Sequence, residues 1–145
     1  MIKQLEEKLH KEIPLTKFMN LKIDDYNNKE LITSATLKNN INDKATAFGG
    51  SLSAITIISA WSSCWLIAKK LNISTKNIVI IKNETLYLKP VNKDIICHTS
   101  KPSPLEISVF KKKYREKGRA SIKIESKVIE DNKICVEFIG IYVIS

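Results

Sequence analysis

The residues with the clearest chemical potential lie between Asn40 and Ser51. This stretch holds two amide side chains, Asn40 and Asn42, and then a glycine pair, Gly49 and Gly50. Glycines let a backbone come close to a ligand, and free N–H groups at the start of a helix can stabilise an oxyanion that develops on a carbonyl. The alternative is structural: a turn that the glycines permit, followed by a helix that Ser51 caps.

A second group of candidates is a cluster of cations in the carboxyl-terminal half. Glu116 is the only acid within it, and its members are Lys111, Lys112, Lys113, Arg115, Lys117, Arg119 and Lys123. Such a cluster suits phosphate groups, and Arg119 can bind a phosphate through two hydrogen bonds. The alternative is a solvated helix end where cations offset the dipole. We favour this alternative for residues 111–113 and leave both interpretations open for Arg119.

Side chains typical of other chemistries are sparse. Only Tyr114 is interleaved with the clustered cations, so a nucleic-acid interface built on stacked aromatics is not favoured. Neither His10 nor His98 belongs to a set of ligands at metal-binding spacing, and we expect no metal site and no cofactor. The cysteines are odd in number and widely spaced, which fits the reducing cytoplasm better than a disulfide framework: Cys64, Cys97 and Cys135.

Composition limits the chain to one domain. It has 145 residues, of which 43% are hydrophobic, and a formal net charge of +9. This length fits one core of ordinary size, so we expect a single domain over residues 1–145, and the charge favours anionic partners.

The uncharged run from Ala45 to Ala68 is long enough to cross a bilayer. Its hydroxyl side chains and glycine pair indicate a buried helix instead, with no membrane association.

Hydrophobic periodicity predicts the elements that must position these residues. In chain order they are a helix over 1–12 that ends near Pro14, strands over 21–25 and 31–37, a polar loop over 38–43, a long apolar helix from Ser51 to about Leu71, strands over 78–88 and 94–99, a short helix, and strands over 120–129 and 134–144. Ser103 can cap the short helix and Gly118 can end it. We expect its inner face to comprise Leu105, Val109, Phe110 and Tyr114.

The order of these elements predicts the fold class. Six antiparallel strands form a sheet with an apolar face that must be covered, and the long helix is the only element long and apolar enough to cover it. The predicted class is therefore α+β: an antiparallel sheet of about six strands wrapped around one long central helix, which is the hotdog arrangement.

Five blocks of sequence together resemble the hotdog-fold thioesterase superfamily. They are Ile13-Pro14-Leu15-Thr16 with Met19, Asn42 to Leu52, Tyr87-Leu88-Lys89-Pro90-Val91 with Asp94, Lys117-Gly118-Arg119-Ala120, and Phe138 to Val143. The blocks run in order across almost the whole chain. They are most similar to the putative thioesterase domain that occurs alone or fused behind a GNAT-type acetyltransferase.

This resemblance implies an activity, an assembly and a set of site residues. The substrate would be an acyl thioester of coenzyme A or of acyl carrier protein, and subunits would form a dimer, or a dimer of dimers, with sheets joined edge to edge. In related phenylacetate-type thioesterases, an Asn positions water or substrate and the backbone at the second glycine polarises the carbonyl; Asn42 and Gly50 match these positions. Substrate contacts would come from Thr46, Phe48, Gly49, Ser51, Lys117, Gly118 and Arg119.

The source of a catalytic base is the main departure from that pattern. The related enzymes place an acid on the first two turns of the helix, where this chain has only uncharged residues from Ala54 to Ile58. An Asn or Thr side chain can orient water but cannot deprotonate it near neutral pH. Asp43 in the loop, or Glu84 on a strand that approaches the partner in such dimers, could act instead. Asp43 could equally be an exposed loop acid, and Glu84 could be a strand residue paired with a nearby lysine, Lys82 or Lys89.

The sequence therefore favours a cytoplasmic acyl-CoA thioesterase. Two alternatives stay open. One is a protein of the same fold that binds acyl thioesters without catalysis, and the other is a small basic nucleic-acid-binding protein.

Overall fold

The computed structural model describes residues 1–74 and 77–145. Its elements, in chain order, are α1 (Ile2–Glu12), α2 (Pro14–Phe18), β1 (Lys22–Tyr26), β2 (Glu30–Ala35), the 3-10 helix η1 (Lys38–Asn40), α3 (Gly49–Lys70), β3 (Ile78–Tyr87), β4 (Ile95–Ser100), α4 (Pro104–Lys117), β5 (Ala120–Glu130) and β6 (Lys133–Ile144). The predicted order is confirmed, with two short helices added, α2 and η1. Pro14 begins α2 because a proline at the first helical position has no N–H to leave unsatisfied.

The described strands form one antiparallel sheet in the order β1-β2-β4-β5-β6-β3. β5 and β6 form a long hairpin whose turn residues, Asp131 and Asn132, both have positive φ. The alternation predicted for β5 is confirmed, because Ile122 and Ile124 are buried while Lys123 between them is exposed. β1 and β3 are the two edges of the sheet.

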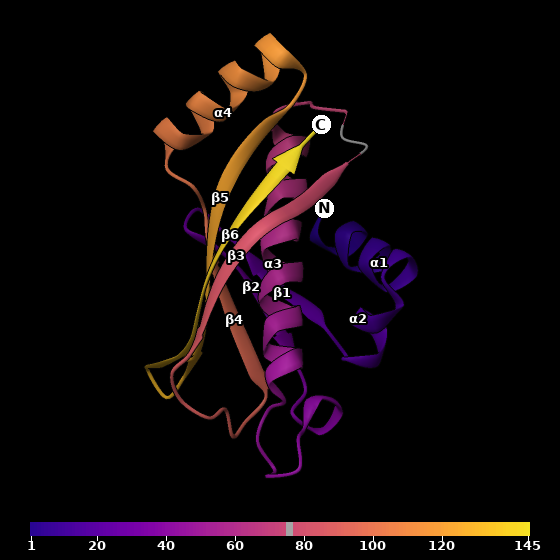
Figure 1. Ribbon diagram of the computed structural model, residues 1–145. Coiled ribbons are helices and arrows are strands. Elements are labelled where there is room, and N and C mark those ends of the chain that lie inside the picture. The colour runs from indigo at the N-terminus through magenta and orange to yellow at the C-terminus, as the bar shows by residue number, and fades with distance from the viewer. Residues whose placement is uncertain (75–76) are drawn as a thin grey trace.

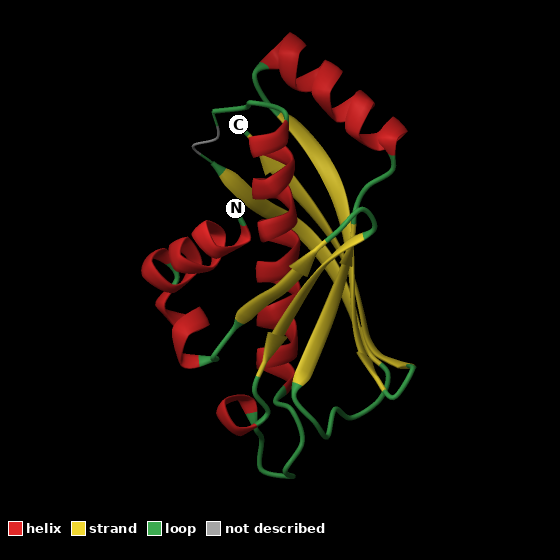
Figure 2. Ribbon diagram, turned by 180° about the vertical axis from the view of Figure 1, so that it is seen from behind, coloured by secondary structure: helices red, strands yellow, loops and turns green. Residues whose placement is uncertain are grey.

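The sheet curls around α3, which lies along its concave side (Figure 1). Seen from behind, α1 and α2 lie on the side of α3 opposite β5 and β6 (Figure 2). Leu5 and Leu9 of α1 are buried in the same cluster as Ile55 and Leu66 of α3. The central helix is therefore covered from two sides, which confirms the predicted α+β class and the hotdog arrangement.

Enclosure accounts for the membrane-like composition of α3. The helix is long and apolar enough to span a bilayer, yet 72% of its most apolar window is buried inside the protein. Its small polar side chains also have partners there. The Ser59 hydroxyl lies 2.6 Å from that of Thr33 on β2, and the Thr56 hydroxyl donates to the Leu52 carbonyl at 3.0 Å. The interpretation of this uncharged run as a buried helix agrees with the structure from Gly49 to Ala68, whereas residues 45–48 precede the helix.

α4 has the predicted ends but a narrower inner face. Ser103 and Glu106 form the capping box, and Gly118 ends the helix with a φ of 71°. The prediction that Leu105 and Val109 face inward was wrong, since they are 74% and 46% exposed. The physical reason is that α4 packs mainly against β5, at one end of the sheet, so only a narrow stripe of the helix is covered.

Gly140 leaves room for two large rings on the buried face of β6. A Cβ built on Gly140 would lie 2.7 Å from Cζ of Phe138 and 2.8 Å from Cε1 of Tyr142, which is closer than side chains approach. Both rings are buried, and the Tyr142 hydroxyl donates to the Ile57 carbonyl of α3 at 2.7 Å, so neither can move aside easily.

We therefore predict that Gly140→Ala lowers the free energy of unfolding by about 1–3 kcal/mol, measured by chemical denaturation. The matched control is Ser121→Ala on the exposed side of β5, which should stay within about 0.5 kcal/mol of the wild type. An unchanged stability for Gly140→Ala would show that the Phe138 and Tyr142 rings can move aside to admit a methyl group.

Candidate active site

The loop that precedes α3 is anchored by a buried amide. The Nδ2 of Asn40 donates to the Met19 carbonyl at 2.9 Å and to the Thr36 carbonyl at 2.7 Å. The Asn40 carbonyl in turn accepts from the Phe48 N–H at 2.7 Å, immediately before the helix. Sequence reasoning gave Asn40 no role. Its burial depends on contacts with α2 and with the end of β2, and no local pattern shows those contacts.

Asn42 stabilises the loop through hydrogen bonds of both its side-chain oxygen and its side-chain nitrogen. Its Oδ1 accepts from the backbone N–H of Lys44 at 2.7 Å and of Thr46 at 3.1 Å. Its Nδ2 donates to the Thr46 hydroxyl at 2.8 Å and, less favourably, to the Ala47 carbonyl at 3.4 Å. The last contact lies beyond the usual range for an N–H to O bond. One Nδ2 hydrogen is therefore only weakly engaged.

The start of α3 has unsatisfied donors. The cap residue is Phe48, whose carbonyl accepts from the N–H groups of Ser51 at 2.9 Å and Leu52 at 3.0 Å. The alternative that Ser51 caps the helix was wrong, because Ser51 lies within the first turn and no side chain caps this end. The N–H groups of Gly49 and Gly50 donate to no acceptor among residues 1–74 and 77–145. Both N–H groups belong to the positive end of the helix dipole.

A cavity opens beside these donors. It has a volume of about 290 Å³ and is lined by Ala47, Gly49, Leu52 and the segment from Tyr87 to Pro90. The Ala47 N–H donates to the Val91 carbonyl at 2.9 Å, so the loop and the segment after β3 are joined at this point. Two sequence blocks that lie far apart in the chain thus form one wall of the cavity.

Phe48 lies over the second glycine. Its side chain is 55% exposed, and a Cβ added to Gly50 would overlap its ring. A Cβ added to Gly49 would meet open space. The Phe48 ring therefore covers one side of the Gly50 backbone, while the Gly49 side stays open to the cavity.

The two predicted acids lie in different environments. Asp43 is in the loop, with a side chain that is 83% exposed and 3.3 Å from the Lys44 ammonium. Glu84 pairs across the sheet with Ile139, which is exposed on the outer face. A bulge between Ile80 and residue 82 shifts the alternation of β3, so Glu84 lies on the face away from α3 instead of sharing the inner face with Ile80. In the described part of the chain, no ion pair joins Glu84 to a lysine.

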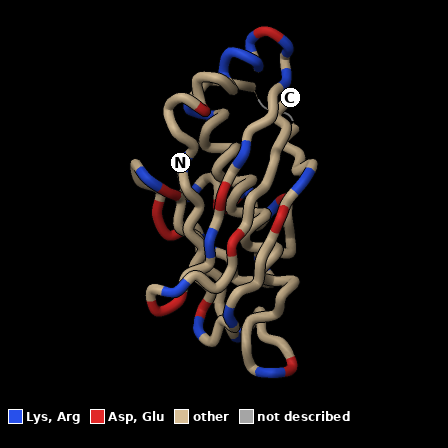
Figure 3. The backbone as a smooth tube through the Cα atoms, turned by 60° about the vertical axis from the view of Figure 1, so that its left-hand side comes forward, with Lys and Arg blue, Asp and Glu red and all other residues tan. Residues whose placement is uncertain are grey.

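One subunit does not bring the predicted phosphate-binding residues to the loop. α4 ends at Lys117, and Gly118 and Arg119 connect it to β5. The first residue of β5 lies at the same level of the sheet as Ile78, the first residue of β3. The cavity is instead at the far end of β3, beside Tyr87, about 30 Å along the strand. Figure 3 shows the cations along the chain, with several on the segment of α4.

Other reactive groups are engaged in packing. Burial raises the pKa of the Cys64 and Cys97 thiols, and a thiol with a raised pKa is a poor nucleophile. Tyr114, the aromatic residue among the clustered cations, packs against Phe110 with ring centroids 6.1 Å apart. Within the described ranges, no three side chains of the metal-binding types lie close enough to hold a metal ion.

Known proteins share this architecture. A protein of unknown function from Chlorobaculum tepidum is 32% identical and superposes with a TM-score of 0.94, over 98% of this chain and 92% of its own. A protein from Shewanella oneidensis described as a putative thioesterase is 28% identical, with a TM-score of 0.86 over 99% and 96% of the two chains. A thioesterase from Haemophilus influenzae is 10% identical, with a TM-score of 0.73 over 100% and 91%, and shows the shared fold alone.

The family match covers almost the whole sequence. Residues 2–145 match the family described as "Putative thioesterase (yiiD_Cterm)", and the match includes the loop, the start of α3 and the segment after β3. This hotdog-fold chain belongs to that putative thioesterase family.

Proposed function

We propose that the protein hydrolyses acyl thioesters of coenzyme A at the start of α3. The observation that carries the proposal is the pair of N–H groups of Gly49 and Gly50, which have no acceptor among the described residues, with Gly49 lining a cavity. Two such donors at a helix N-terminus can hold the oxyanion of a tetrahedral intermediate. Membership of a thioesterase family supports the thioester as the substrate class.

In the proposed reaction, the thioester carbonyl oxygen accepts hydrogen bonds from these two N–H groups. Water attacks the carbonyl carbon and gives up a proton to a base as the new C–O bond forms. The C–S bond then breaks, its electron pair leaves with the sulfur of coenzyme A, and the proton passes from the base to that thiolate. The products are a carboxylic acid and a free thiol.

The loop residues supply the water and the base in this proposal. The Nδ2 hydrogen of Asn42 that makes the long 3.4 Å contact is the one left to donate to a water while the shorter bonds of the loop stay in place. Asp43 follows Asn42 directly and can take the proton, whereas Glu84 lies on the outer face of the sheet. Thr46 fixes the Asn42 amide, and the Phe48 ring flanks the acyl group at Gly50.

A second copy of the chain would complete the site. β3 pairs with β6 on one side only, and the following side chains at this edge are exposed: Val79, Ile81, Leu86 and Tyr87. Long apolar edge strands favour pairing with another strand. If two β3 edges pair antiparallel, the start of one β3 lies against the end of the other. Lys117 and Arg119 of one copy would then approach the cavity of the other, where the coenzyme A phosphates would lie.

Binding without catalysis is a second candidate function. It is favoured by one observation: the first turn of α3 carries no acid, and the Asp43 side chain is largely exposed. A protein of this kind would show saturable acyl-CoA binding and no thiol release.

We predict that Asn42→Ala lowers kcat/KM by at least about tenfold, because the water loses the donor that orients it. The measurement is thiol release from short, medium, long and aromatic acyl-CoAs. The matched control is Asn39→Ala, which removes only an exposed hydrogen bond to the Phe18 carbonyl and should keep wild-type turnover. Wild-type turnover in a folded Asn42→Ala protein would remove this role.

A pair of isosteric variants tests the base. Asp43→Asn should lower kcat by about 100-fold, because an amide cannot accept the proton from water, while Glu84→Gln should retain wild-type kcat. Both changes keep side-chain volume and act at exposed positions, so stability should not change. The opposite result, a loss confined to Glu84→Gln, would assign the base to β3 and contradict the proposal for the loop.

A charged substitution on β3 tests whether this edge strand forms the contact between subunits. Ile81→Lys should convert dimers to monomers in light scattering, because a lysine at an apolar strand edge opposes strand pairing. Leu105→Lys, on the exposed side of α4, is the matched control and should leave the mass unchanged. A dimer that persists in Ile81→Lys would place the contact between subunits elsewhere.

A further inference from the structure

A second cavity lies at the other end of α3. It has a volume of about 510 Å³, within the usual range for small-molecule sites. Its walls come from four segments: the turn after β1, the end of α3, the loop after β4 and the first turns of α4. Lys70, at the end of α3, is about 30 Å along the helix from Gly50, so this cavity is separate from the candidate active site.

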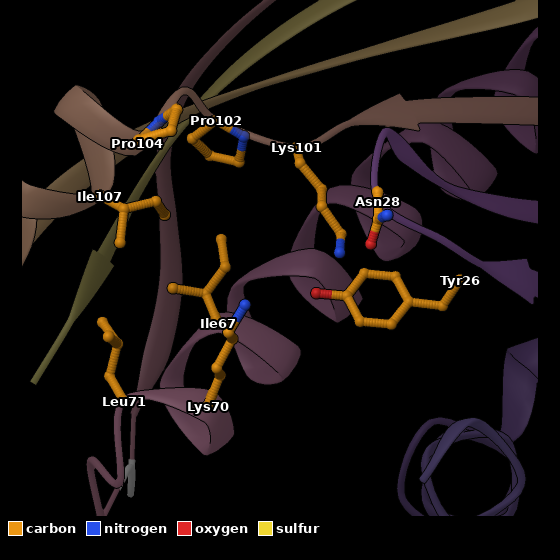
Figure 4. A pocket seen from close by; sticks show the side chains of 9 residues that line it. All are labelled: Tyr26, Asn28, Ile67, Lys70, Leu71, Lys101, Pro102, Pro104 and Ile107. Carbon is orange, nitrogen blue, oxygen red and sulfur yellow. The ribbon is translucent and has the colours of Figure 1, made fainter.

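The cavity has a polar side and an apolar side. Figure 4 shows the Lys101 ammonium, the Tyr26 hydroxyl and the Asn28 amide close to one another on one side. Ile107 and Leu71 lie on the other side. A ligand that fits both sides must therefore carry a polar head on an apolar body.

Two lysines give the cavity a positive charge. Lys70 and Lys101 both line the cavity, and neither takes part in an ion pair within residues 1–74 and 77–145. The ammonium of Lys101 is held 4.0 Å from the centroid of the Tyr26 ring, a cation–π contact that fixes its position. Burial lowers the pKa of Lys101, and the charge of Lys70 lowers it further, so the two cations repel each other across the cavity. An anion between them would relieve that repulsion.

We propose that this cavity binds a small amphiphile with one anionic head group, whose head lies between Lys70 and Lys101 and whose apolar chain lies against Ile67, Leu71 and Ile107. The head can be a carboxylate, as in a free fatty acid, or a phosphate monoester. This inference does not depend on thioester hydrolysis, because none of these residues belongs to the loop before α3.

Calorimetric titration of the full chain with four probes tests the proposal. Decanoate and decyl phosphate carry the two possible heads on the same chain, decanol has the chain without charge, and acetate has the charge without the chain. We expect saturable binding of decanoate, of decyl phosphate or of both, and binding of decanol and acetate that is weaker by about tenfold or more. The anionic probe that binds more tightly identifies the head group. No saturable binding of either anionic probe, or equal binding of decanol, would overturn the proposal.

Lysine variants locate the binding. Lys101→Met and Lys70→Met each keep an unbranched apolar side chain and should weaken the anionic probes by about tenfold, the effect of losing one charged hydrogen bond. Lys70→Met involves no cation–π contact, so it also controls for any shift of Tyr26 in the other variant. Lys112→Met, at an exposed position of α4 outside the cavity, should bind like the wild type. Binding that neither cavity variant weakens would place the ligand elsewhere and contradict the assignment.

Discussion

The enclosure of α3 by the sheet is the constraint on which the rest of the structure depends. An apolar helix of this length is stable in water only if its surface is covered, and its hydroxyl groups then need partners inside the protein. Ser59 meets Thr33 of β2, and Tyr142 of β6 reaches the Ile57 carbonyl, so the inner face of the sheet satisfies polar groups as well as covering apolar ones. Gly140 leaves room on β6 for the rings of Phe138 and Tyr142. These contacts fix the helix axis and therefore the position of its first turn.

The first turn of α3 combines a rigid support with unsatisfied donors. Asn40 ties the preceding loop to α2 and to the end of β2, and Asn42 closes the loop on itself. Gly49 and Gly50 follow with N–H groups that have no acceptor among residues 1–74 and 77–145, although a capping side chain at this position would stabilise the helix by about 1 kcal/mol. In our proposal, the thioester oxygen takes the place of that cap. The opposite end of the helix opens on the cavity with two lysines, so both ends of α3 face possible ligands of negative charge.

Local patterns predicted the elements well and the site only in part. The alternation of β5, the cap of α4 at Ser103 and the left-handed Gly118 are set by residues close in sequence, and each was confirmed. The sequence could not predict which face of the sheet Glu84 occupies. A single bulge in β3 moves Glu84 to the outer face, and that bulge depends on how β3 pairs with β6. The distance between Arg119 and the loop depends likewise on the register of β3, β6 and β5. The cavity beside Lys101 joins four segments, so no local pattern could have shown it.

In the proposed mechanism, the N–H groups of Gly49 and Gly50 at the start of α3 hold the thioester carbonyl. This contact can be measured by amide NMR of the full chain, titrated with a non-hydrolysable acyl-CoA analogue that keeps the carbonyl. We expect the Gly49 and Gly50 amide signals to shift and to saturate together with binding, because their N–H groups, which have no acceptor among the described residues, gain one. Saturable binding of the analogue that leaves both glycine signals unchanged would show that the carbonyl binds elsewhere.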